Sequence, residues 1–454
     1  MSVIIVGAGI TGLAAAYELT RRGVPFTLLE ASPRPGGLIY TDKVDGFTIE
    51  GGPDSMLAQK PAGLELCEEL GLGARLISPN PPRRAYVLAN NRLHPLPRRS
   101  VLGIPTTWRG IAKYGLLPWS ARARIALEPL LRRRATAAAD ESVGSFFRRR
   151  FGSSAARLIA EPLLGGIHAG RIDELSIRSL FPRLSDAESR RGSVLLALRR
   201  TRRGTEEGMF RSLPSGMSEL VSAIERQLPR DSLRLNMRVT GISREEEGWR
   251  VLCERAGLAA RAVVLAVPAH VAAQLLQSVD MEASQLCAQV PYVSTASVVL
   301  AWPRQEIGHD LAGSGFVVAR VPGAPRITAC TWVSSKWSGR APAGWALLRA
   351  FIGGAHDPDA VAMPDADLVQ TAVRDLSGVL GIATAPHLTR VYRWRNAGAQ
   401  HTVGHLDRIA RLERRLAAHP GIAVAGSGFR AIGIPDCIAD GRAAARGVTG
   451  GQAP

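Results

Sequence analysis

Three glycines near the start of the chain have the types and spacing of a site that binds a dinucleotide. Gly7, Gly9 and Gly12 follow a short apolar run at residues 3–6, which is typical of a buried parallel strand. In such a site the first glycine makes a tight turn, the second lets the backbone approach a pyrophosphate, and the third lets a helix pack closely. Glu30 lies 18 residues beyond Gly12, where a carboxylate can accept hydrogen bonds from ribose hydroxyls.

A second pair of glycines favours FAD as the dinucleotide. Arg34-Pro35-Gly36-Gly37 follows soon after Glu30 and resembles the second fingerprint of FAD-dependent, amine-oxidase-like flavoproteins. Its bare backbone would pass close to the ribityl and pyrophosphate groups of the flavin. A carboxylate at position 30 would repel a 2′-phosphate, which disfavours NADP. No cysteine or histidine lies in a recognised attachment motif, so we expect FAD to be bound without a covalent bond.

The elements that must position these residues predict an α/β fold. A helix is expected over residues 13–22 and a second strand over 26–29, which completes a Rossmann-type βαβ unit. Strand-like runs return in the middle and near the end of the chain, so the dinucleotide-binding domain is expected to be discontinuous, with another domain inserted. Strands are expected at 233–239, 249–253, 262–267, 295–301, 347–352 and 422–426, and helices at 61–77, 366–380 and 437–447. Residues 98–200 have helical periodicity.

Composition favours a cytoplasmic protein of two or three domains without membrane-spanning segments. The chain has 454 residues, enough for more than one core. Its longest apolar run, at 262–276, is interrupted by Pro268 and His270 and is too short to span a membrane. Five scattered cysteines form no C-x-x-C pair, which argues against disulfides or a metal site and suits a reducing cytosol. A strand directly after Met1 leaves no room for a signal peptide.

The positive charge is large and unevenly distributed. The net charge is +18, and residues 98–150 hold twelve Arg and Lys against three acids. Such a surface can meet nucleic acid, an anionic membrane or an acidic substrate, or it can reflect an arginine-rich proteome. No nucleic-acid motif accompanies the charge, so nucleic acid is not an expected partner. Residues 116–134 combine apolar residues such as Trp119 with arginines, which fits either an amphipathic membrane anchor or an ordinary packed helix.

Three longer motifs resemble those of the protoporphyrinogen oxidase family. They are Gly46-Phe47-Thr48-Ile49-Glu50-Gly51-Gly52-Pro53-Asp54-Ser55, then Glu161-Pro162-Leu163-Leu164-Gly165-Gly166-Ile167-His168-Ala169-Gly170, and finally Gly426-Ser427-Gly428 with Gly433-Ile434-Pro435-Asp436-Cys437-Ile438. The resemblance covers the whole chain, and the last two motifs are specific. It points to the bacterial oxygen-dependent branch, whose members oxidise protoporphyrinogen IX or coproporphyrinogen III.

The resemblance implies three domains and one reaction. It implies an FAD-binding domain at 1–85, 205–268 and 395–454, a mixed-sheet substrate-binding domain at 86–97 and 269–394, and a mostly helical, membrane-facing domain at 98–204. The implied reaction is a six-electron oxidation of a porphyrinogen by FAD and O2, with release of H2O2. Because the flavin N5 performs the chemistry, no catalytic acid or base is predicted among the side chains.

The resemblance, together with the fingerprints, assigns contacts to particular residues. The expected FAD contacts are Gly7, Ala8, Gly9, Ile10, Thr11, Gly12, Glu30, Ala31, Arg34, Gly36, Gly37, Gly51, Gly52, Pro53, Asp54, Val239, Trp394, Gly426, Ser427, Ile432, Gly433 and Ile434. Four residues are candidates to meet the substrate, namely Gly166, His168, Arg98 and Lys336. For three of them a second interpretation stays open: His168 as a structural histidine, Arg98 as a solvated arginine, and Lys336 either near N5 or paired with a carboxylate.

Two departures from the family pattern leave the binding of substrate carboxylates unassigned. Gly51-Gly52 stands where related sequences often carry an arginine, and Ala89 stands near the position of a propionate-binding arginine in plant relatives. Protoporphyrinogen IX, with two propionates, suits a membrane-docking segment better than coproporphyrinogen III, with four. We therefore predict protoporphyrinogen IX as substrate, with coproporphyrinogen III as the alternative. Further candidate partners are the inner face of the cell membrane, through peripheral contact, other haem-pathway enzymes, and a second copy of the chain in a homodimer.

Overall fold

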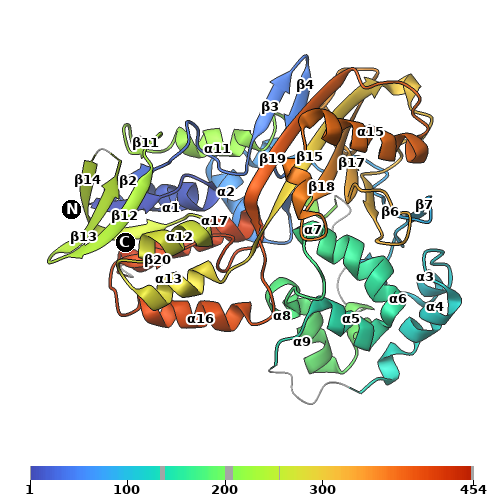
Figure 1. Cartoon of the computed structure of the whole chain (residues 1–454), viewed down its shortest axis with the longest axis horizontal. Helices are drawn as coiled ribbons and strands as arrows, with labels where there is room; N and C mark the ends of the chain where they lie inside the picture. Colours follow the sequence, from blue (N-terminus) through green and yellow to red (C-terminus); the bar gives the residue numbers. More distant parts are fainter. Residues whose placement is uncertain (1, 133–138, 200–207, 255, 451–454) are drawn as a thin grey trace.

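The computed structural model describes residues 2–132, 139–199, 208–254 and 256–450. Figure 1 shows two sheets side by side, each with its own helices, and a group of helices below the second sheet. The sheets share no strand. This architecture is the α/β arrangement with an added mixed sheet and a helical part that the sequence predicts.

The first sheet carries the predicted dinucleotide site and is built from three separate parts of the chain. Its order is β11-β2-β1-β14-β13-β12, with β20 also paired to β14. Strand β1 is parallel to both β2 and β14, which confirms the predicted βαβ opening. The bounds are β1 Ser2–Val6, β2 Phe26–Leu29, β11 Leu233–Arg234, β12 Val239–Glu245, β13 Gly248–Cys253, β14 Ala256–Leu265 and β20 Ile422–Val424.

Helices cover both faces of this sheet. Val3 and Ile5 of β1 pack in one core with helices α1 (Ile10–Arg21) and α17 (Ile434–Val448). Ile4 and Val6 face the other way and pack with α12 (Ala269–Leu276), α13 (Met281–Ala288) and α16 (His405–Leu416). Because successive side chains point to opposite faces and both faces are buried, residues 3–6 of β1 include no polar side chain. This explains its uninterrupted apolar sequence.

The second sheet has the order β19-β15-β18-β17-β16-β6-β7. Its long central strands contain the predicted runs 295–301 and 347–352, paired antiparallel. Helix α15 (Asp365–Leu380) packs on one face, and the hairpin of β3 and β4 packs on the other through Phe47 and Ile49. The bounds are β3 Thr41–Val44, β4 Phe47–Glu50, β6 Ala85–Ala89, β7 Arg92–Pro95, β15 Tyr292–Pro303, β16 Gly315–Val318, β17 Ala329–Trp332, β18 Trp345–Gly353 and β19 Leu388–Ala399.

The region from 98 to 199 is mostly helical, as predicted. Its helices are α3 Trp108–Ala112, α4 Trp119–Ala126, α5 Val143–Phe151, α8 Ile177–Leu180, α9 Pro182–Arg191 and α10 Val194–Arg199. A π-helical segment, Ala156–Gly165, leads into the short helix α7 (Gly166–His168). Pro162 lies inside the π-helical segment, where the missing amide of proline is easier to accommodate than in regular α-helix. Among the described residues no helix is long and apolar enough to cross a membrane.

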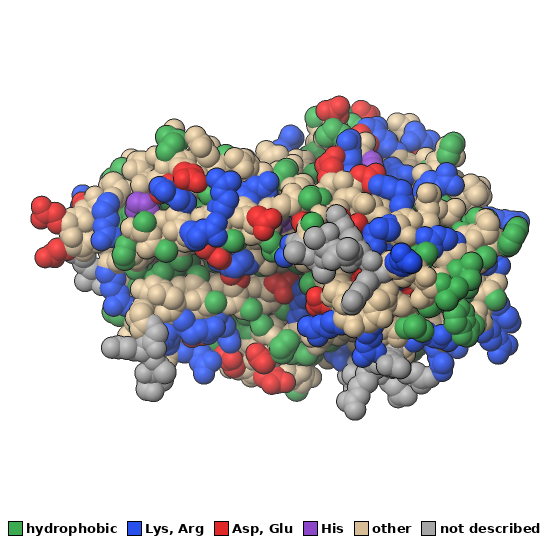
Figure 2. All heavy atoms as spheres, turned by 90° about the horizontal axis from the view of Figure 1, so that it is seen from below, with side chains coloured by type: hydrophobic (Ala, Val, Ile, Leu, Met, Phe, Trp, Pro, Cys, Tyr) green, Lys and Arg blue, Asp and Glu red, His purple; other side chains and the backbone are tan. Residues whose placement is uncertain are grey.

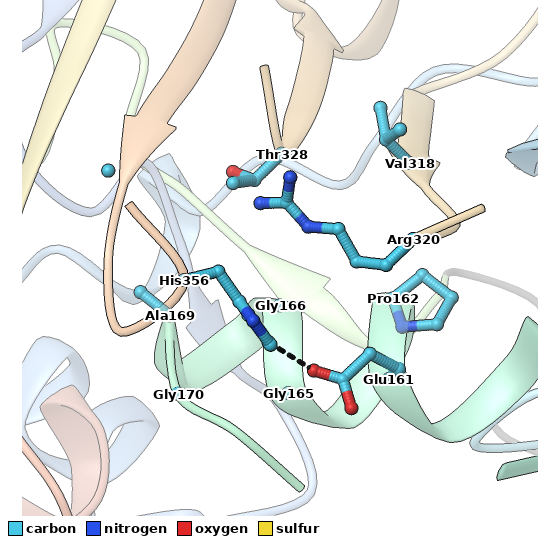
Figure 3. Close-up of a pocket in the computed structure, with 11 residues that line it drawn as sticks. Glu161, Pro162, Gly165, Gly166, Ala169, Gly170, Val318, Arg320, Thr328 and His356 are labelled. Carbon is cyan, nitrogen blue, oxygen red and sulfur yellow. Dashed lines mark hydrogen bonds and ion pairs between the residues drawn. The ribbon is translucent and has the colours of Figure 1, made fainter. Parts of the chain in front are cut away.

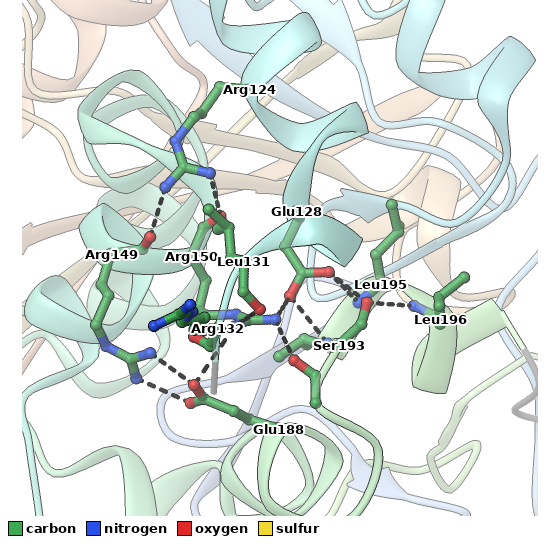
Figure 4. Close-up of polar contacts among 12 residues, drawn as sticks. Arg124, Glu128, Leu131, Arg132, Arg149, Arg150, Glu188, Ser193, Leu195 and Leu196 are labelled. Carbon is green, nitrogen blue, oxygen red and sulfur yellow. Dashed lines mark hydrogen bonds and ion pairs between the residues drawn. The ribbon is translucent and has the colours of Figure 1, made fainter. Parts of the chain in front are cut away.

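A buried ion pair links the helices of this region (Figure 4). Arg150 on α5 and Glu128 are both fully buried and form a salt bridge. The same carboxylate accepts hydrogen bonds from Ser193 Oγ at 2.5 Å and from the backbone N–H groups of Val194 and Leu195 at 3.0 and 3.1 Å. Since a buried charge is costly unless it is paired and hydrogen-bonded, these contacts fix α5 relative to the start of α10.

Three expected elements differ from the structure. The helix expected over 61–77 is α2, Pro61–Glu69, followed by a single 3-10 turn at Gly73–Arg75, because Gly71 adopts a φ of 73° and ends the helix. The strand expected over 233–239 stops at Arg234, since Asn236 turns the chain with a φ of 54°. Segment 116–134 is not one helix: α4 lies between Pro118 and a 3-10 turn at Glu128–Leu130, and Arg133 and Arg134 lie outside the described residues.

Candidate active site

The first glycine turn has the shape that a pyrophosphate needs. A Cβ at Gly12 would lie 1.8 Å from Gly7 O, so only glycine allows α1 to pack this closely on the turn after β1. A Cβ at Gly9 would meet no atom within 4 Å, which leaves open space beside the start of α1. No side chain caps this helix, and its first turn carries no acid. The N–H groups and the positive end of the helix dipole are therefore available to an anion.

Glu30 lies directly after β2, against the same turn. Its carboxylate accepts hydrogen bonds from the N–H groups of Ala8, at 2.7 Å, and Ser32, at 2.9 Å. Its backbone is fixed by bonds to Arg234 and Met237 at the strand edge. A carboxylate oxygen has more than one acceptor direction, so both oxygens can still accept from a ribose. Val239, another predicted contact, begins β12 two residues beyond Met237.

The second glycine turn lies on the first. Gly36 forms a bridge with Gly9, and its N–H donates to Ala8 O at 2.8 Å. A Cβ at Gly37 would lie 3.1 Å from the Cα of Gly9, so this close approach requires glycine. Arg34 donates to Gly37 O at 2.9 Å and to Ile39 O at 3.1 Å. The structure thus uses Arg34 to shape the turn, while Ala31 is exposed beside it.

The segment after β4 is held at the junction of the two sheets. Arg349, a buried residue of β18, donates to Glu50 O and to Gly52 O, both at 2.6 Å. Trp394 of β19 donates from Nε1 to Gly51 O at 2.8 Å. Sequence reasoning missed Arg349, although an arginine in the middle of the apolar strand β18 is the kind of signal that marks a buried polar contact.

Asp54 completes this segment with an ion pair. Its Oδ2 accepts from Lys336 Nζ at 2.8 Å and from Trp337 Nε1 at 3.1 Å. Burial by itself would raise the pKa of Asp54, but the charges of Lys336 and Arg349 and the hydrogen bond from Lys336 hold that pKa well below its usual range. In the structure Lys336 pairs with the carboxylate of Asp54, and its predicted contact with the substrate stays a prediction.

The C-terminal motif returns to the same turn. Helix α17 packs along α1 so closely that a Cβ at Gly441 would lie 2.1 Å from Thr11 O. The N–H groups of Ile432 and Gly433 point to Asp436 Oδ2 at 3.3 Å, and the same oxygen pairs with Lys60 at 2.5 Å. Upstream, the Gly426 N–H donates to Asp440, and Ser427 O accepts from His401. Ile434 is the first residue of the helix.

A pocket opens between the helical region and the second sheet (Figure 3). It is open to solvent, and the space between its walls, about 330 Å³, includes that open solvent. Gly166, whose contact with the substrate stays a prediction, lines it, and His356 Nε2 lies 2.5 Å from Glu161 Oε1 on its wall. The lining residues are Glu161, Pro162, Gly165, Gly166, Ala169, Gly170, Val318, Arg320, Thr328, Gly353 and His356. Sequence reasoning missed Arg320 and His356, which lie outside every recognised motif.

The other substrate candidates lie outside this lining. Arg98 is exposed on the link between β7 and β8 (Ser100–Val101). His168 is partly buried with its ring edge against Phe181, at a centroid distance of 5.8 Å. Burial, with the nearby charges of His401 and Lys60, lowers the pKa of His168 to about 4, so the ring is neutral near pH 7. The roles assigned to both residues stay predictions.

Comparison with known proteins gives consistent results. A family model described as flavin containing amine oxidoreductase matches residues 10–449. The coproporphyrinogen III oxidase of Bacillus subtilis (strain 168) is 38% identical over 97% of this chain and 96% of that protein. The chloroplastic protoporphyrinogen oxidase 1 of Spinacia oleracea is 28% identical, over 96% of this chain and 82% of that protein. A crystal structure of a proposed protoporphyrinogen oxidase from Exiguobacterium sp. 255-15 superimposes with a TM-score of 0.88, at 35% identity and 98% coverage of both chains.

Proposed function

Because the chain belongs to the flavin-containing amine oxidoreductase family, we propose that it is an FAD-dependent, O2-dependent coproporphyrinogen III oxidase. One observation carries the choice of substrate: the similarity to the coproporphyrinogen III oxidase of Bacillus subtilis covers nearly both chains, at 38% identity against 28% for the spinach protoporphyrinogen oxidase. The findings therefore favour the alternative that sequence reasoning placed second over its first choice, protoporphyrinogen IX.

The proposed reaction converts one coproporphyrinogen III and three O2 into one coproporphyrin III and three H2O2. Six electrons and six hydrogens leave the substrate in three rounds of two. Bound FAD would supply the hydride acceptor, its N5 atom, and would pass the electrons to O2. The protein's part is to bind, to orient and to exclude water, and it needs no acid or base of its own.

The described residues are suited to that part. The open space at Gly9 and the uncapped start of α1 would hold the pyrophosphate, and Glu30 would hold the ribose. Arg349 and Trp394 donate to backbone carbonyls of the Gly51–Asp54 segment, and Lys336 binds the side chain of Asp54. We propose that this segment lies along the flavin. We propose that the pocket beside Gly166 receives the tetrapyrrole. We propose the domain boundaries expected from the sequence for the parts of the chain that bind FAD, bind the substrate and face the membrane.

We also propose that the helical region docks on anionic membrane surfaces. Six large apolar side chains of this region are exposed, led by Leu130 at 80% and Trp119 at 78%; the others are Trp108, Leu127, Ile167 and Leu196. Figure 2 shows hydrophobic side chains gathered beside Lys and Arg side chains at the end of the molecule where α3 and α4 lie in Figure 1. Apolar residues set among arginines are typical of peripheral membrane contact.

The test of the substrate is a ratio of specificity constants. Coproporphyrinogen III and protoporphyrinogen IX are offered to the holoenzyme under identical detergent, and kcat/KM is measured together with O2 uptake. The proposal expects a higher kcat/KM for coproporphyrinogen III and three O2 consumed per porphyrin formed. A preference for protoporphyrinogen IX would contradict the substrate and leave an oxidase, whereas no turnover of either compound would contradict the oxidase itself.

A further inference from the structure

One cation of the pocket has no anion of its own. Arg320 follows β16 directly after the buried Ala319, and its guanidinium points into the same space as His356 and Glu161 (Figure 3). Within the part of the chain that the structure describes, no carboxylate lies within 4.0 Å of this guanidinium, and no hydrogen bond from it is formed. Arg320 is nevertheless partly buried in the pocket wall.

The two acids close enough to act on Arg320 are both engaged by other residues. Glu161 binds His356 at 2.5 Å. Asp357 is bound by both Arg326 Nε and Nη2, at 2.6 and 3.1 Å. Burial lowers the pKa of Arg320, and the charges of Glu161 and Asp357 only partly oppose that effect. Desolvating a cation without a partner costs free energy, and this cost is recovered when a ligand brings the missing anion.

We propose that Arg320 binds a carboxylate of the substrate and so determines specificity for carboxylate-rich porphyrinogens. The inference rests on the proposed function, because coproporphyrinogen III carries four propionates at its rim. A guanidinium presents parallel N–H donors that match the two oxygens of a carboxylate. The pocket is small and open to solvent, so we expect it to hold one edge of the tetrapyrrole, with its propionate, rather than the whole ring.

Two neighbouring side chains, Glu161 and Thr328, do not compete with a ligand for the Arg320 guanidinium. Glu161 is held away from the guanidinium by His356, and Thr328 Oγ1 donates to Phe351 O at 3.3 Å. The backbone of Gly165 and Gly166 forms another part of the wall without adding a side chain. A propionate can therefore reach Arg320 without displacing a protein carboxylate.

The test compares holoenzyme variants in binding and in turnover. Arg320→Gln removes the charge, Arg320→Lys keeps it, and Arg250→Gln removes an arginine from strand β13 of the other sheet as a matched control. Binding of coproporphyrin III and of its tetramethyl ester is followed by porphyrin fluorescence. Arg320→Gln is expected to weaken coproporphyrin III binding and raise KM by about tenfold or more, with a small change in kcat. Arg320→Lys should restore part of this loss, and Arg250→Gln should have no effect.

Each outcome bears on the inference. If Arg320→Gln binds coproporphyrin III as tightly as the parent while the parent turns the porphyrinogen over, the inference is wrong and the proposed function stands. If the parent neither binds nor oxidises the compound, both fail. Should Arg320→Gln not fold, as judged by flavin content and melting, the parent and Arg320→Lys decide. Equal affinity of the parent for coproporphyrin III and its ester, or a preference for the free acid that Arg320→Lys leaves unchanged, would overturn the inference. A clear preference for the free acid that is reduced in Arg320→Lys would support it.

Discussion

At the scale of single residues, the glycines of the first turn have two separable roles. Gly12 is needed for packing, because its Cβ would overlap a backbone oxygen, whereas Gly9 faces open space. Both belong to the same fingerprint, so the sequence predicts that they matter but does not divide packing from binding. The structure makes that division, and it can be tested by two matched substitutions.

Gly9→Ala should fold and lose flavin, while Gly12→Ala should lose stability. The backbone of Gly9 has a φ of −66°, which alanine also adopts, so we expect a change in unfolding free energy of no more than about 1 kcal/mol. Its methyl group would occupy the space for the pyrophosphate and weaken FAD binding about tenfold or more. Gly12→Ala should lower the unfolding free energy by about 1–3 kcal/mol, because the added methyl group overpacks the turn.

Flavin retained on dialysis and the melting temperature check this pair. Unchanged flavin retention in Gly9→Ala would argue against a pyrophosphate at that position. A Gly12→Ala protein as stable as the parent would contradict the packing role.

Site residues outside the fingerprints, such as Arg320, cannot be assigned from the sequence alone. The sequence shows that Ala89 supplies no cation, and the structure shows that Leu88 pairs with Val318 on the neighbouring strand β16, so that Arg320 follows close to Ala89 in space. The two positions are 231 residues apart in the chain. A strand pairing between distant segments is set by tertiary packing, which no local pattern reports.

At the scale of elements, buried polar contacts decide which helices are fixed. Arg150 and Glu128 lie in a core of phenylalanine and leucine side chains. Removing one partner leaves an uncompensated buried charge, so Arg150→Met and Glu128→Leu should each lower the unfolding free energy by about 3–5 kcal/mol. Arg148→Ala breaks the exposed pair with Asp173 and should cost no more than about 1 kcal/mol.

Urea denaturation of the three variants is the measurement. A small effect of Arg150→Met, similar to that of Arg148→Ala, would show that the buried pair does not hold α5 and α10 together. If the double variant Arg150→Met with Glu128→Leu is more stable than either single variant, the loss of stability in the single variants comes from the unpaired buried charge, as the structure indicates.

A histidine pair joins the helical region to the turn after β20 and should make stability depend on pH. His401 and His405 stack at 3.9 Å and bond to Ser427 O and Phe429 O. Burial lowers the pKa of His405 to about 3. The folded state therefore keeps this ring neutral, while the unfolded chain takes up a proton near pH 6.5. Stability is complete above pH 6.5 and falls towards pH 3, by up to about 1.4 kcal/mol per pH unit for each such histidine.

Unfolding free energies between pH 7.5 and 5 check this dependence. His405→Gln should flatten the slope, and His387→Gln, on the exposed side chain of another histidine, should leave it unchanged. Equal slopes in the parent and His405→Gln would contradict the assignment.

Element prediction succeeded where periodicity and turn residues agreed. The runs at 295–301, 347–352 and 366–380 lie within β15, β18 and α15. The two strands are buried on both faces and α15 on one, which their mostly apolar and helically periodic sequences match. Helix α16 was missed, since its stretch at 405–416 is rich in charge and its few apolar residues become informative only against the core they join.

At the scale of the whole molecule, charge and apolar exposure coincide on the helical region. We expect sedimentation with anionic vesicles at low salt and less at high salt, since each arginine near such a surface contributes about 1 kcal/mol that salt screens. A double variant, Trp119→Ser with Leu130→Ser, should bind less at both salt concentrations. Met281→Ser, which removes an exposed apolar side chain from α13, is the control. Equal binding to neutral vesicles would indicate apolar docking alone, and binding to neither would contradict the docking proposal.

The arrangement of the two sheets also sets the chemistry that the molecule can perform. The glycine turns lie on the first sheet, the pocket of Gly166 and Arg320 lies at the ends of β16 and β18 of the second sheet, and the Gly51–Asp54 segment lies between the two sheets. The sequence predicted the first and third of these features from motifs. The pocket could not be predicted from the sequence, because its wall combines the π-helical segment with strands more than 150 residues away.

An anaerobic half-reaction tests most directly the proposal that the protein oxidises coproporphyrinogen III through FAD. The flavin-loaded protein is mixed with coproporphyrinogen III without O2, and the flavin absorbance is followed. We expect the flavin to bleach with two electrons taken up per flavin, and its colour to return with formation of H2O2 when O2 is admitted. A flavin that stays oxidised in the presence of excess coproporphyrinogen III would contradict it.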